Sequence, residues 1–301
     1  MKAVQIHAYG EIDQLRFEEV PTPQPGADEV LVKVLATSVN PIDWKIRSGA
    51  VKDRMPIQFP FIPGRDVAGE VTAVGANVKD FRPGQRVMGL VNHTYAEYLV
   101  AKASILTVIP EGLAVETAGA IPLVVLTGAQ LVEKGVEPKA GDTVLITGAL
   151  GSVGRAAVYV AKQHGAKVIA GVRANQREEA QGLGAEQIAA IDEDAEIARL
   201  PQLDSIGDTV NGETITKLLA KVKKGGRLGS VVGKPAAAEQ AGVTVEAVMA
   251  QPDAARLQQL AEAVQKGWLV IPISRKFRLS EVQEAQKFAE KGAKGKVVLI
   301  P

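Results

Sequence analysis

The chain has 301 residues, more than one ordinary hydrophobic core accommodates, so two domains are expected. A net charge of +1 with 23% charged residues excludes a strongly basic nucleic-acid-binding chain and is typical of a soluble enzyme. The absence of cysteine excludes disulfides, thiolate catalysis and cysteine-ligated metal, and it fits a reducing compartment. No apolar run reaches the roughly 20 residues of a membrane helix. The N-terminus shows no export signal, so we expect a cytoplasmic protein that binds neither membrane nor nucleic acid.

The first third of the chain has the pattern of short strands. β-Branched residues alternate from Val30 to Val34, and two further runs of this type cover residues 67–74 and 86–90. Pairs such as Pro63-Gly64 separate the runs, as expected for turns between strands. We therefore expect a compact, barrel-like β domain.

From about residue 110 the pattern changes to alternating strands and helices. An apolar strand is predicted at 143–147, then a helix with Val153, Ala156 and Val160 on one face, then a strand at 167–172. Such a strand–helix–strand unit predicts a parallel sheet with helices on both faces. Further strands are expected at 205–210 and 226–232, with helices at 214–222 and from Pro252 onwards.

The C-terminal tail returns to the β pattern. Residues 296–300 are predicted to form a final strand, and Ser280 and Gln283 have the spacing of a capping box before it. We expect this tail to rejoin the N-terminal domain. The predicted domains are therefore residues 1–118 with 269–301, which are β-rich, and residues 119–268, which carry the parallel sheet.

A glycine-rich turn joins the first strand of the parallel sheet to its helix. Three glycines lie three residues apart in it. In a dinucleotide-binding turn, the first glycine permits a sharp turn, the second lets the backbone approach the pyrophosphate, and the third lets the helix pack on the strand. The helix N-terminus adds N–H groups and a positive dipole end. The loop residues predicted to bind the dinucleotide are Gly148, Ala149, Gly151, Ser152, Val153 and Gly154. The alternative is a structural turn in an unrelated α/β protein.

The end of the second strand distinguishes NADPH from NADH. An acidic residue there binds the ribose hydroxyls of NAD. This chain instead has Arg173 and Arg177, and no carboxylate occurs before Glu178. Arginine suits bidentate contacts with a phosphate, so NADPH is the predicted cofactor. The alternative is that both arginines are solvated at the start of a surface helix.

With these residues in place, the chain resembles the medium-chain dehydrogenase/reductase superfamily, in its zinc-free quinone oxidoreductase branch, which includes zeta-crystallin-like and alkenal/enone oxidoreductases. The resemblance covers essentially the whole chain. Besides the glycine loop, its markers occur in family order at residues 38–43 (SVNPID), 63–69 (PGRDVAG), 73–75 (AVG), 84–87 (GQRV), 95–98 (YAEY), 121–123 (IPL) and 294–299 (KGKVVL).

The resemblance implies an α/β protein with a GroES-like β-rich catalytic domain, a Rossmann domain with a doubly wound parallel sheet, and a cleft between them. It also implies NADPH-dependent reduction of a quinone or an α,β-unsaturated carbonyl. Zinc-dependent relatives have cysteine and histidine ligands. Here Asn40 and Asp43 lie near the first ligand positions, and Arg65-Asp66 replaces a His-Glu pair. No metal site is therefore expected.

The same resemblance suggests which residues form the catalytic site. Asn40 is expected to face the nicotinamide or the substrate, or else to be a turn residue before Pro41. Thr127 is expected near the carboxamide. Lys45 either polarises the acceptor carbonyl or is a solvated lysine that covers Trp44.

Further residues are expected around the acceptor and the cofactor. Asp43 either lines the pocket or braces its loop, and Arg65 either polarises the acceptor or pairs with Asp66. The other expected pocket residues are His93 and Tyr95. Four residues are expected beside the cofactor: Asn211, Val232 and Gly233 at strand ends, and Lys296 from the tail.

Three alternatives stay open for the function: a quinone or enone reductase, a trans-acting enoyl reductase, and a non-catalytic NADPH binder of the crystallin or RNA-binding kind. Near-neutral charge disfavours nucleic acid as the main partner. A small-molecule substrate is expected. We also expect a homodimer that pairs through an edge strand of the Rossmann sheet, for which residues 226–232 are the predicted strand.

Overall fold

The computed structural model describes the backbone of residues 1–301 and every side chain except those of residues 239 and 240. Contacts divide the chain into two compact units. Unit 1 is Met1–Leu123 with Pro252–Pro301, and unit 2 is Val124–Gln251. The division falls inside α3 (Pro122–Gln130). The predicted domain boundaries 118/119 and 268/269 stay predictions.

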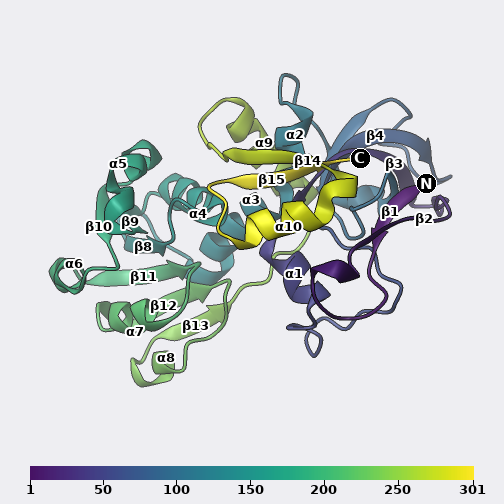
Figure 1. Ribbon diagram of the computed structural model, residues 1–301. Helices are drawn as coiled ribbons and strands as arrows, with labels where there is room; N and C mark the ends of the chain where they lie inside the picture. The colour runs from purple at the N-terminus through teal and green to yellow at the C-terminus, as the bar shows by residue number, and fades with distance from the viewer. The chain divides into compact units, whose positions relative to one another are not determined.

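Unit 2 is built on a six-stranded sheet in which every pairing is parallel (Figure 1). Its strands are β8 (Thr143–Thr147), β9 (Lys167–Val172), β10 (Gln187–Ala190), β11 (Leu203–Asp208), β12 (Val222–Ser230) and β13 (Thr244–Ala247). Their order is β10-β9-β8-β11-β12-β13, so the direction of winding reverses between β8 and β11. This is the doubly wound Rossmann order, in which ligands bind at the carboxyl ends of the strands beside the reversal.

The helices of unit 2 connect these strands. They are α4 (Ser152–Gln163), α5 (Arg177–Ala180), α6 (Asp194–Arg199), α7 (Glu213–Leu219) and α8 (Ala237–Gln240), preceded by the π-helical segment Leu131–Val136. The strand–helix–strand prediction is thus confirmed, and the predicted strands at 143–147 and 167–172 match β8 and β9. The edge-strand prediction was wrong. Most of residues 226–232 belong to β12, which is paired on both sides, by β11 and β13.

Unit 1 contains a mixed seven-stranded sheet in the order β14-β15-β3-β4-β5-β7, with β6 also paired to β3. Its strands are β3 (Glu29–Val39), β4 (Asp66–Val74), β5 (Arg86–Leu90), β6 (Tyr98–Lys102), β7 (Leu106–Val108), β14 (Ile273–Arg278) and β15 (Lys296–Ile300), and β1 (Lys2–Gln5) pairs separately with β2 (Arg16–Glu19). The helices are α1 (Pro41–Arg47), α2 (Val115–Ala118), α9 (Ala254–Gln265) and α10 (Val282–Glu290). The predicted β-rich domain is confirmed.

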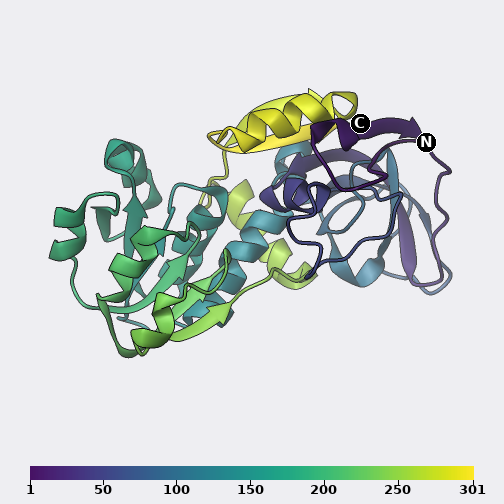
Figure 2. The same cartoon turned by 60° about the horizontal axis from the view of Figure 1, so that its bottom comes forward.

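The C-terminal tail rejoins the N-terminal segment, as predicted. β15 pairs antiparallel with β3, with Val297 opposite Val39, and both views show the two chain ends close together (Figures 1 and 2). The predicted capping box was wrong. Glu281, not Gln283, accepts the capping hydrogen bond, from the N–H of Arg278 at 2.7 Å. Gln283 instead donates from its amide nitrogen to the carbonyl oxygen of Leu15 at 2.9 Å, because the helix packs against the N-terminal segment.

Candidate functional site

The glycine loop leaves β8 at the edge of the sheet where dinucleotides bind in this fold. Gly148 has a φ of +57°, which a side chain would strain. A Cβ on Gly154 would overlap the carbonyl oxygen of Gly148 and come within 2.8 Å of the Cα of Ala149, so only glycine lets α4 pack this closely. Gly151 is exposed and forms the N-cap of α4. The three glycines therefore provide the turn, the open backbone and the close packing that the spacing predicted.

The N-terminus of α4 has the charge and geometry to accept a pyrophosphate. The helix is 12 residues long, its first turn contains no acidic residue, and its N-cap glycine provides no side-chain cap. The N–H groups and the helix dipole are thus directed at a site without a competing carboxylate. These residues fit a dinucleotide.

Three further predicted cofactor residues follow neighbouring strands at this same edge of the sheet. Asn211 is exposed after β11, and its φ of +58° is rare for a non-glycine residue. Val232 and Gly233 are half-buried after β12, and Gly233 also has a positive φ, of +118°. The sheet topology therefore brings these residues to the same edge as the glycine loop.

The two arginines after β9 differ in their surroundings. Arg177 pairs with Glu196, with 2.7 Å between Nη2 and Oε2. Arg173 is exposed, and among the side chains that are described it has no ion-pair partner. Its backbone N–H is held by the Gln176 side chain at 3.0 Å. Of the two guanidinium groups, that of Arg173 is therefore the one without an ion-pair partner among the described side chains.

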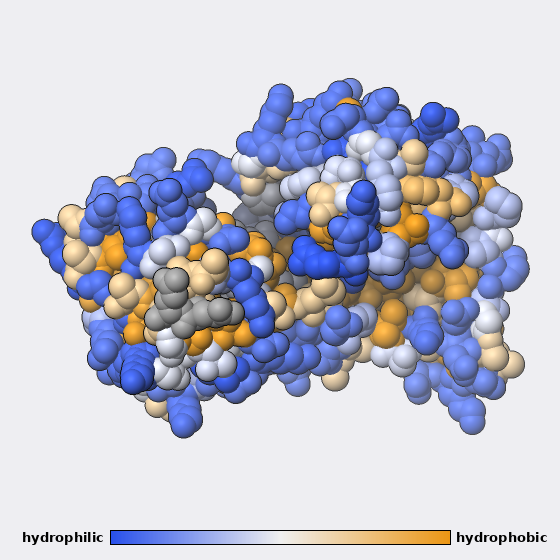
Figure 3. All heavy atoms as spheres, turned by 90° about the horizontal axis from the view of Figure 1, so that it is seen from below, coloured by the Kyte–Doolittle hydropathy of each residue, from blue (hydrophilic) through white to orange (hydrophobic). Residues whose placement is uncertain are grey.

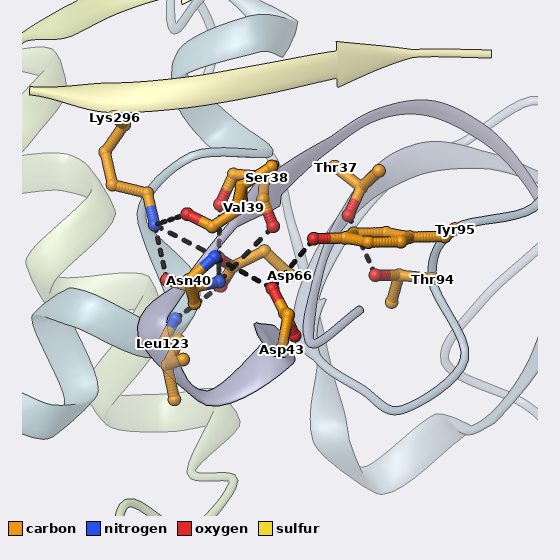
Figure 4. A network of polar contacts seen from close by, with 10 residues as sticks. All are labelled: Thr37, Ser38, Val39, Asn40, Asp43, Asp66, Thr94, Tyr95, Leu123 and Lys296. Atoms are coloured by element: carbon orange, nitrogen blue, oxygen red, sulfur yellow. Dashed lines mark hydrogen bonds and ion pairs between the residues drawn. The ribbon is translucent and has the colours of Figure 1, made fainter. Parts of the chain in front are cut away.

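A second group of polar side chains lies buried in unit 1, around Asn40 (Figure 4). The amide nitrogen of Asn40 donates to Asp66 Oδ2 at 2.7 Å and to the carbonyl oxygen of Ser38 at 3.3 Å. The amide oxygen accepts a 2.5 Å hydrogen bond from Lys296 Nζ, which also lies 3.7 Å from Asp66 Oδ2. Asp66 Oδ1 accepts from the N–H of Leu123 at 2.6 Å. β3, β4, α3 and β15 together therefore fix the orientation of one amide group.

Asn40 and Lys296 are thus more enclosed than the sequence suggested. Asn40 is 0% exposed and Lys296 5% exposed, and burial lowers the pKa of the lysine. Asn40 also precedes Pro41 at the N-cap of α1, which was the alternative interpretation of this residue. Their contacts with each other are internal to unit 1, and their contacts with a cofactor stay predictions.

Asp43 and Tyr95 form a second buried pair beside Asn40. Asp43 Oδ2 accepts from the N–H of Asn40 and from the Tyr95 hydroxyl, both at 2.8 Å, whereas Oδ1 is buried without a partner. Burial raises the pKa of Asp43 to about 6, although both hydrogen bonds oppose that shift. Burial and the adjacent carboxylate raise the pKa of Tyr95 well above its ordinary value. This geometry fits the interpretation that Asp43 braces its loop.

The remaining predicted pocket residues are more accessible. Lys45 is exposed on α1, and Arg65 is half-buried with an unpartnered Nε. His93 is exposed at a φ of +65°, and its Nδ1 lies 2.9 Å from the carbonyl oxygen of Ile62. Thr127 is half-buried on α3 and belongs to unit 2.

The sequence interpretation assigned no site role to two buried carboxylates in these networks. It placed Asp66 only beside Arg65, as part of the replacement of a His-Glu pair or as the partner of Arg65, and Asp208 only in a strand. Among the described side chains, the cation paired with Asp66 is Lys296. Asp66 is the first residue of β4 and Asp208 is the last residue of β11, and both are fully buried. A carboxylate directly before the apolar run at 67–69 is a signal that could have identified Asp66. Among the side chains the structure describes, no group of three His, Asp or Glu could hold a metal ion. Within the same part of the chain, no helix has the length and apolarity needed to cross a bilayer.

Two family models match separate parts of the chain, and individual relatives match its whole length. The alcohol dehydrogenase GroES-like domain matches residues 26–111, and the zinc-binding dehydrogenase family matches residues 183–299. The chain is 30% identical to the chloroplast envelope quinone oxidoreductase homolog of Arabidopsis thaliana, over 100% of this chain and 98% of that protein. The quinone oxidoreductase from Coxiella burnetii has a similar structure, with a TM-score of 0.89, 31% identity and coverage of 100% and 99%. Mycobacterial Rv1454c complexed with NADPH gives a TM-score of 0.85 at 27% identity, covering 100% of both chains.

Proposed function

This chain belongs to the quinone oxidoreductase branch of the medium-chain dehydrogenase/reductase superfamily, and from that premise we propose that it is a zinc-independent, NADPH-dependent reductase of quinones or α,β-unsaturated carbonyls. The observation that carries the proposal is the glycine loop at the point where the sheet reverses its winding. Such a loop binds the pyrophosphate of a dinucleotide. When bound, NADPH supplies the hydride.

The choice of NADPH over NADH rests on Arg173. Its guanidinium is exposed and unpaired among the described side chains, whereas Arg177 is held by Glu196. An arginine at the end of the second strand suits the 2′-phosphate. The NADPH complex of a similar protein is consistent with this choice.

Zinc independence is supported by the donor atoms of this chain. Cysteine is absent from the sequence. Asn40 and Asp43 lie near the first ligand positions of zinc-dependent relatives. The amide nitrogen of Asn40 donates to Asp66 and its amide oxygen accepts from Lys296, while Asp43 accepts from the Tyr95 hydroxyl. The Asn40 amide and one oxygen of Asp43 are therefore already engaged in hydrogen bonds within the protein.

We assign the acceptor contacts to the accessible side chains. The exposed ammonium of Lys45 is positioned on a short helix to hydrogen-bond an acceptor carbonyl and stabilise negative charge that develops on its oxygen. Arg65 directly precedes β4 and His93 follows β5, and we assign both side chains to the acceptor. We assign Thr127, on α3, to the nicotinamide carboxamide. The buried residues Asn40, Asp43, Tyr95 and Lys296 hold the frame of this site.

The proposal includes a cytoplasmic homodimer. In the part of the sheet that is described, β13 pairs only with β12, so its other edge is unpaired and can pair with a second copy of the chain. Figure 3 shows hydrophobic side chains on the face of unit 2 that carries α8 and β13. A hollow of about 430 Å³ on this region is lined by Lys234, Pro235, Ala236, Ala238, Val243 and Val245. Sedimentation showing only monomers at micromolar concentration would contradict the dimer.

The reaction is tested by following NADPH oxidation with benzoquinone, phenanthrenequinone, acrolein, butenone and crotonyl-CoA, each repeated with NADH. We expect turnover of a quinone or an enone with NADPH well ahead of NADH, unchanged by a chelator. Preference for crotonyl-CoA would instead indicate an enoyl reductase. Nucleotide binding without turnover of any acceptor would indicate a non-catalytic binder, and no nucleotide binding would overturn the proposal.

A further inference from the structure

A carboxylate without a charged partner lies buried directly beneath the glycine loop. Asp208, the last residue of β11, is 0% exposed. Its Oδ1 accepts hydrogen bonds from the Thr147 hydroxyl at 2.8 Å and from the N–H groups of Val210 and Asn211 at 3.1 Å each. Its Oδ2 accepts from the Ser230 hydroxyl at 3.2 Å. Among the described side chains, no cation pairs with it.

These contacts join the ends of three adjacent strands. Thr147 ends β8 directly before Gly148, Asp208 ends β11, and Ser230 ends β12. Thr209 strengthens the connection, because its N–H donates to the Thr147 hydroxyl at 2.9 Å and its own hydroxyl donates to the Thr147 carbonyl at 2.8 Å. The turn at Gly148 and the loop after β11 therefore form one hydrogen-bonded unit with the Asp208 carboxylate at its centre.

The donors around Asp208 suit a carboxylate, because both of its oxygens are acceptors. Three donors meet Oδ1 and one meets Oδ2. Burial of a charge without an ion partner is unfavourable, and apolar residues often replace buried charges without loss of stability. A role in stability alone therefore explains Asp208 poorly, whereas a role in fixing loop geometry explains all four contacts.

The loop held in this way has an unusual conformation. Asn211 has a φ of +58°, and its N–H is bonded to Asp208. On the other side, a Cβ on Gly148 would lie 2.5 Å from the Thr209 hydroxyl, so the two turns are in direct contact. Movement of either turn would require movement of the other.

We propose that Asp208 is a positioning residue for the dinucleotide: through Thr147 and the N–H groups of residues 210 and 211, it fixes the Gly148 turn and the β11 loop in the binding geometry before the cofactor arrives. This inference rests on the proposed NADPH-dependent function. The carboxylate contacts backbone and hydroxyl groups, and it acts on the cofactor only through them. Fixing the loop in advance lowers the entropic cost of binding.

The test uses four variants of the full chain. Thr147→Val removes the hydroxyl at nearly constant shape, and Thr147→Ser retains it. Asp208→Asn keeps the shape but weakens the hydrogen bonds, because those to a charged acceptor are stronger. Asp204→Asn is the matched control: Asp204 lies at the opposite end of β11, where it accepts from the Thr143 N–H and Lys223.

The NADPH dissociation constant is measured by fluorescence titration, together with KM for NADPH, kcat at saturation and the urea midpoint. We expect Thr147→Val and Asp208→Asn to raise the dissociation constant and KM for NADPH about 10-fold, with kcat within about 2-fold of wild type. Thr147→Ser and Asp204→Asn should bind NADPH as wild type does. If Thr147→Val does not fold, Asp208→Asn is compared with Thr147→Ser, and only Asp208→Asn should weaken NADPH binding.

Two outcomes would overturn the inference in distinguishable ways. If wild type, Thr147→Val and Asp208→Asn all bind NADPH equally well, Asp208 has no positioning role and the proposed function stands. This holds whether or not the urea midpoints of the two variants are lower. If wild type binds no nicotinamide nucleotide, the proposed function fails and the positioning role fails with it.

Discussion

Lys296 Nζ donates a 2.5 Å hydrogen bond to the amide oxygen of Asn40, although the two residues are 256 positions apart in the chain. On the opposite side of the same amide group, its nitrogen donates to Asp66. A lysine from the C-terminal strand and a carboxylate from β4 therefore fix an asparagine between β3 and α1. The nitrogen and oxygen of Asn40 are distinguished by these partners, since only the oxygen can accept from an ammonium.

Lys296→Met should destabilise the protein by about 3 kcal/mol, because it leaves the Asp66 carboxylate buried without its cation. Unfolding in urea measures the loss, with exposed Lys294→Met as the control. Adding Asp66→Asn to Lys296→Met removes the unpaired charge and should recover at least about 1 kcal/mol. Strictly additive losses in the double variant would mean that the two residues do not interact.

Asp43 predicts a pH dependence of stability. Burial raises its pKa in the folded chain to about 6, whereas its ordinary value is 3.8. The tighter binding of the proton by the folded chain stabilises the fold fully at pH values below 3.8, the ordinary pKa. This stabilisation is lost as the pH rises through about 6, the pKa of Asp43 in the folded chain. The loss amounts to about 3 kcal/mol at neutral pH, from about 1.4 kcal/mol for each pKa unit.

Asp43→Asn removes this titration and can still accept from Asn40 and Tyr95. Relative to wild type, its free energy of unfolding should therefore rise by up to about 3 kcal/mol between roughly pH 4 and pH 7. Urea unfolding across this range, with exposed Asp53→Asn as the control, measures the difference. A difference between variant and wild type that does not change with pH would contradict the raised pKa.

The glycine loop predicts two different consequences of adding a methyl group. Gly154→Ala places a Cβ against the backbone of Gly148 and Ala149, so both stability and NADPH binding should fall. Gly151→Ala meets only the Gly148 carbonyl, at 3.2 Å, so its stability should stay within about 1 kcal/mol of wild type while NADPH binding weakens about 10-fold or more.

Gly182→Ala is the control for both, because a Cβ there would meet no atom within 4 Å beyond the adjoining backbone. Thermal unfolding and fluorescence titration with NADPH separate the two effects. Unchanged NADPH affinity in Gly151→Ala would exclude a close approach of the pyrophosphate to this backbone.

The two arginines should contribute unequally to cofactor choice. Arg173→Ala should reduce the preference for NADPH over NADH by about 10- to 100-fold, since a hydrogen bond to a charged group contributes about 1.5–3 kcal/mol. Arg177→Ala should reduce it by less than about 3-fold, because its guanidinium is held by Glu196. Steady-state kinetics with both nucleotides measure this ratio, and equal losses in the two variants would refute the distinction.

The sequence by itself determined the elements that local interactions specify. Residues 86–90, 143–147 and 167–172 form strands within the predicted bounds, because hydrophobic runs between turn residues specify strands locally. The glycine spacing likewise specified the turn, since steric limits on φ and on helix packing act within a few residues. The two-domain order followed from the change in pattern along the chain.

Tertiary structure decided what depends on pairing between distant segments. Residues 226–232 have a strand pattern whether the strand is central or at an edge, and only the addition of β13 made β12 central. Gln283 had the spacing of a cap, but the neighbouring N-terminal segment offered the Leu15 carbonyl instead. Lys296 and Asp208 show the same limit: a buried polar side chain needs partners, and packing of remote segments determines which groups come within hydrogen-bond distance.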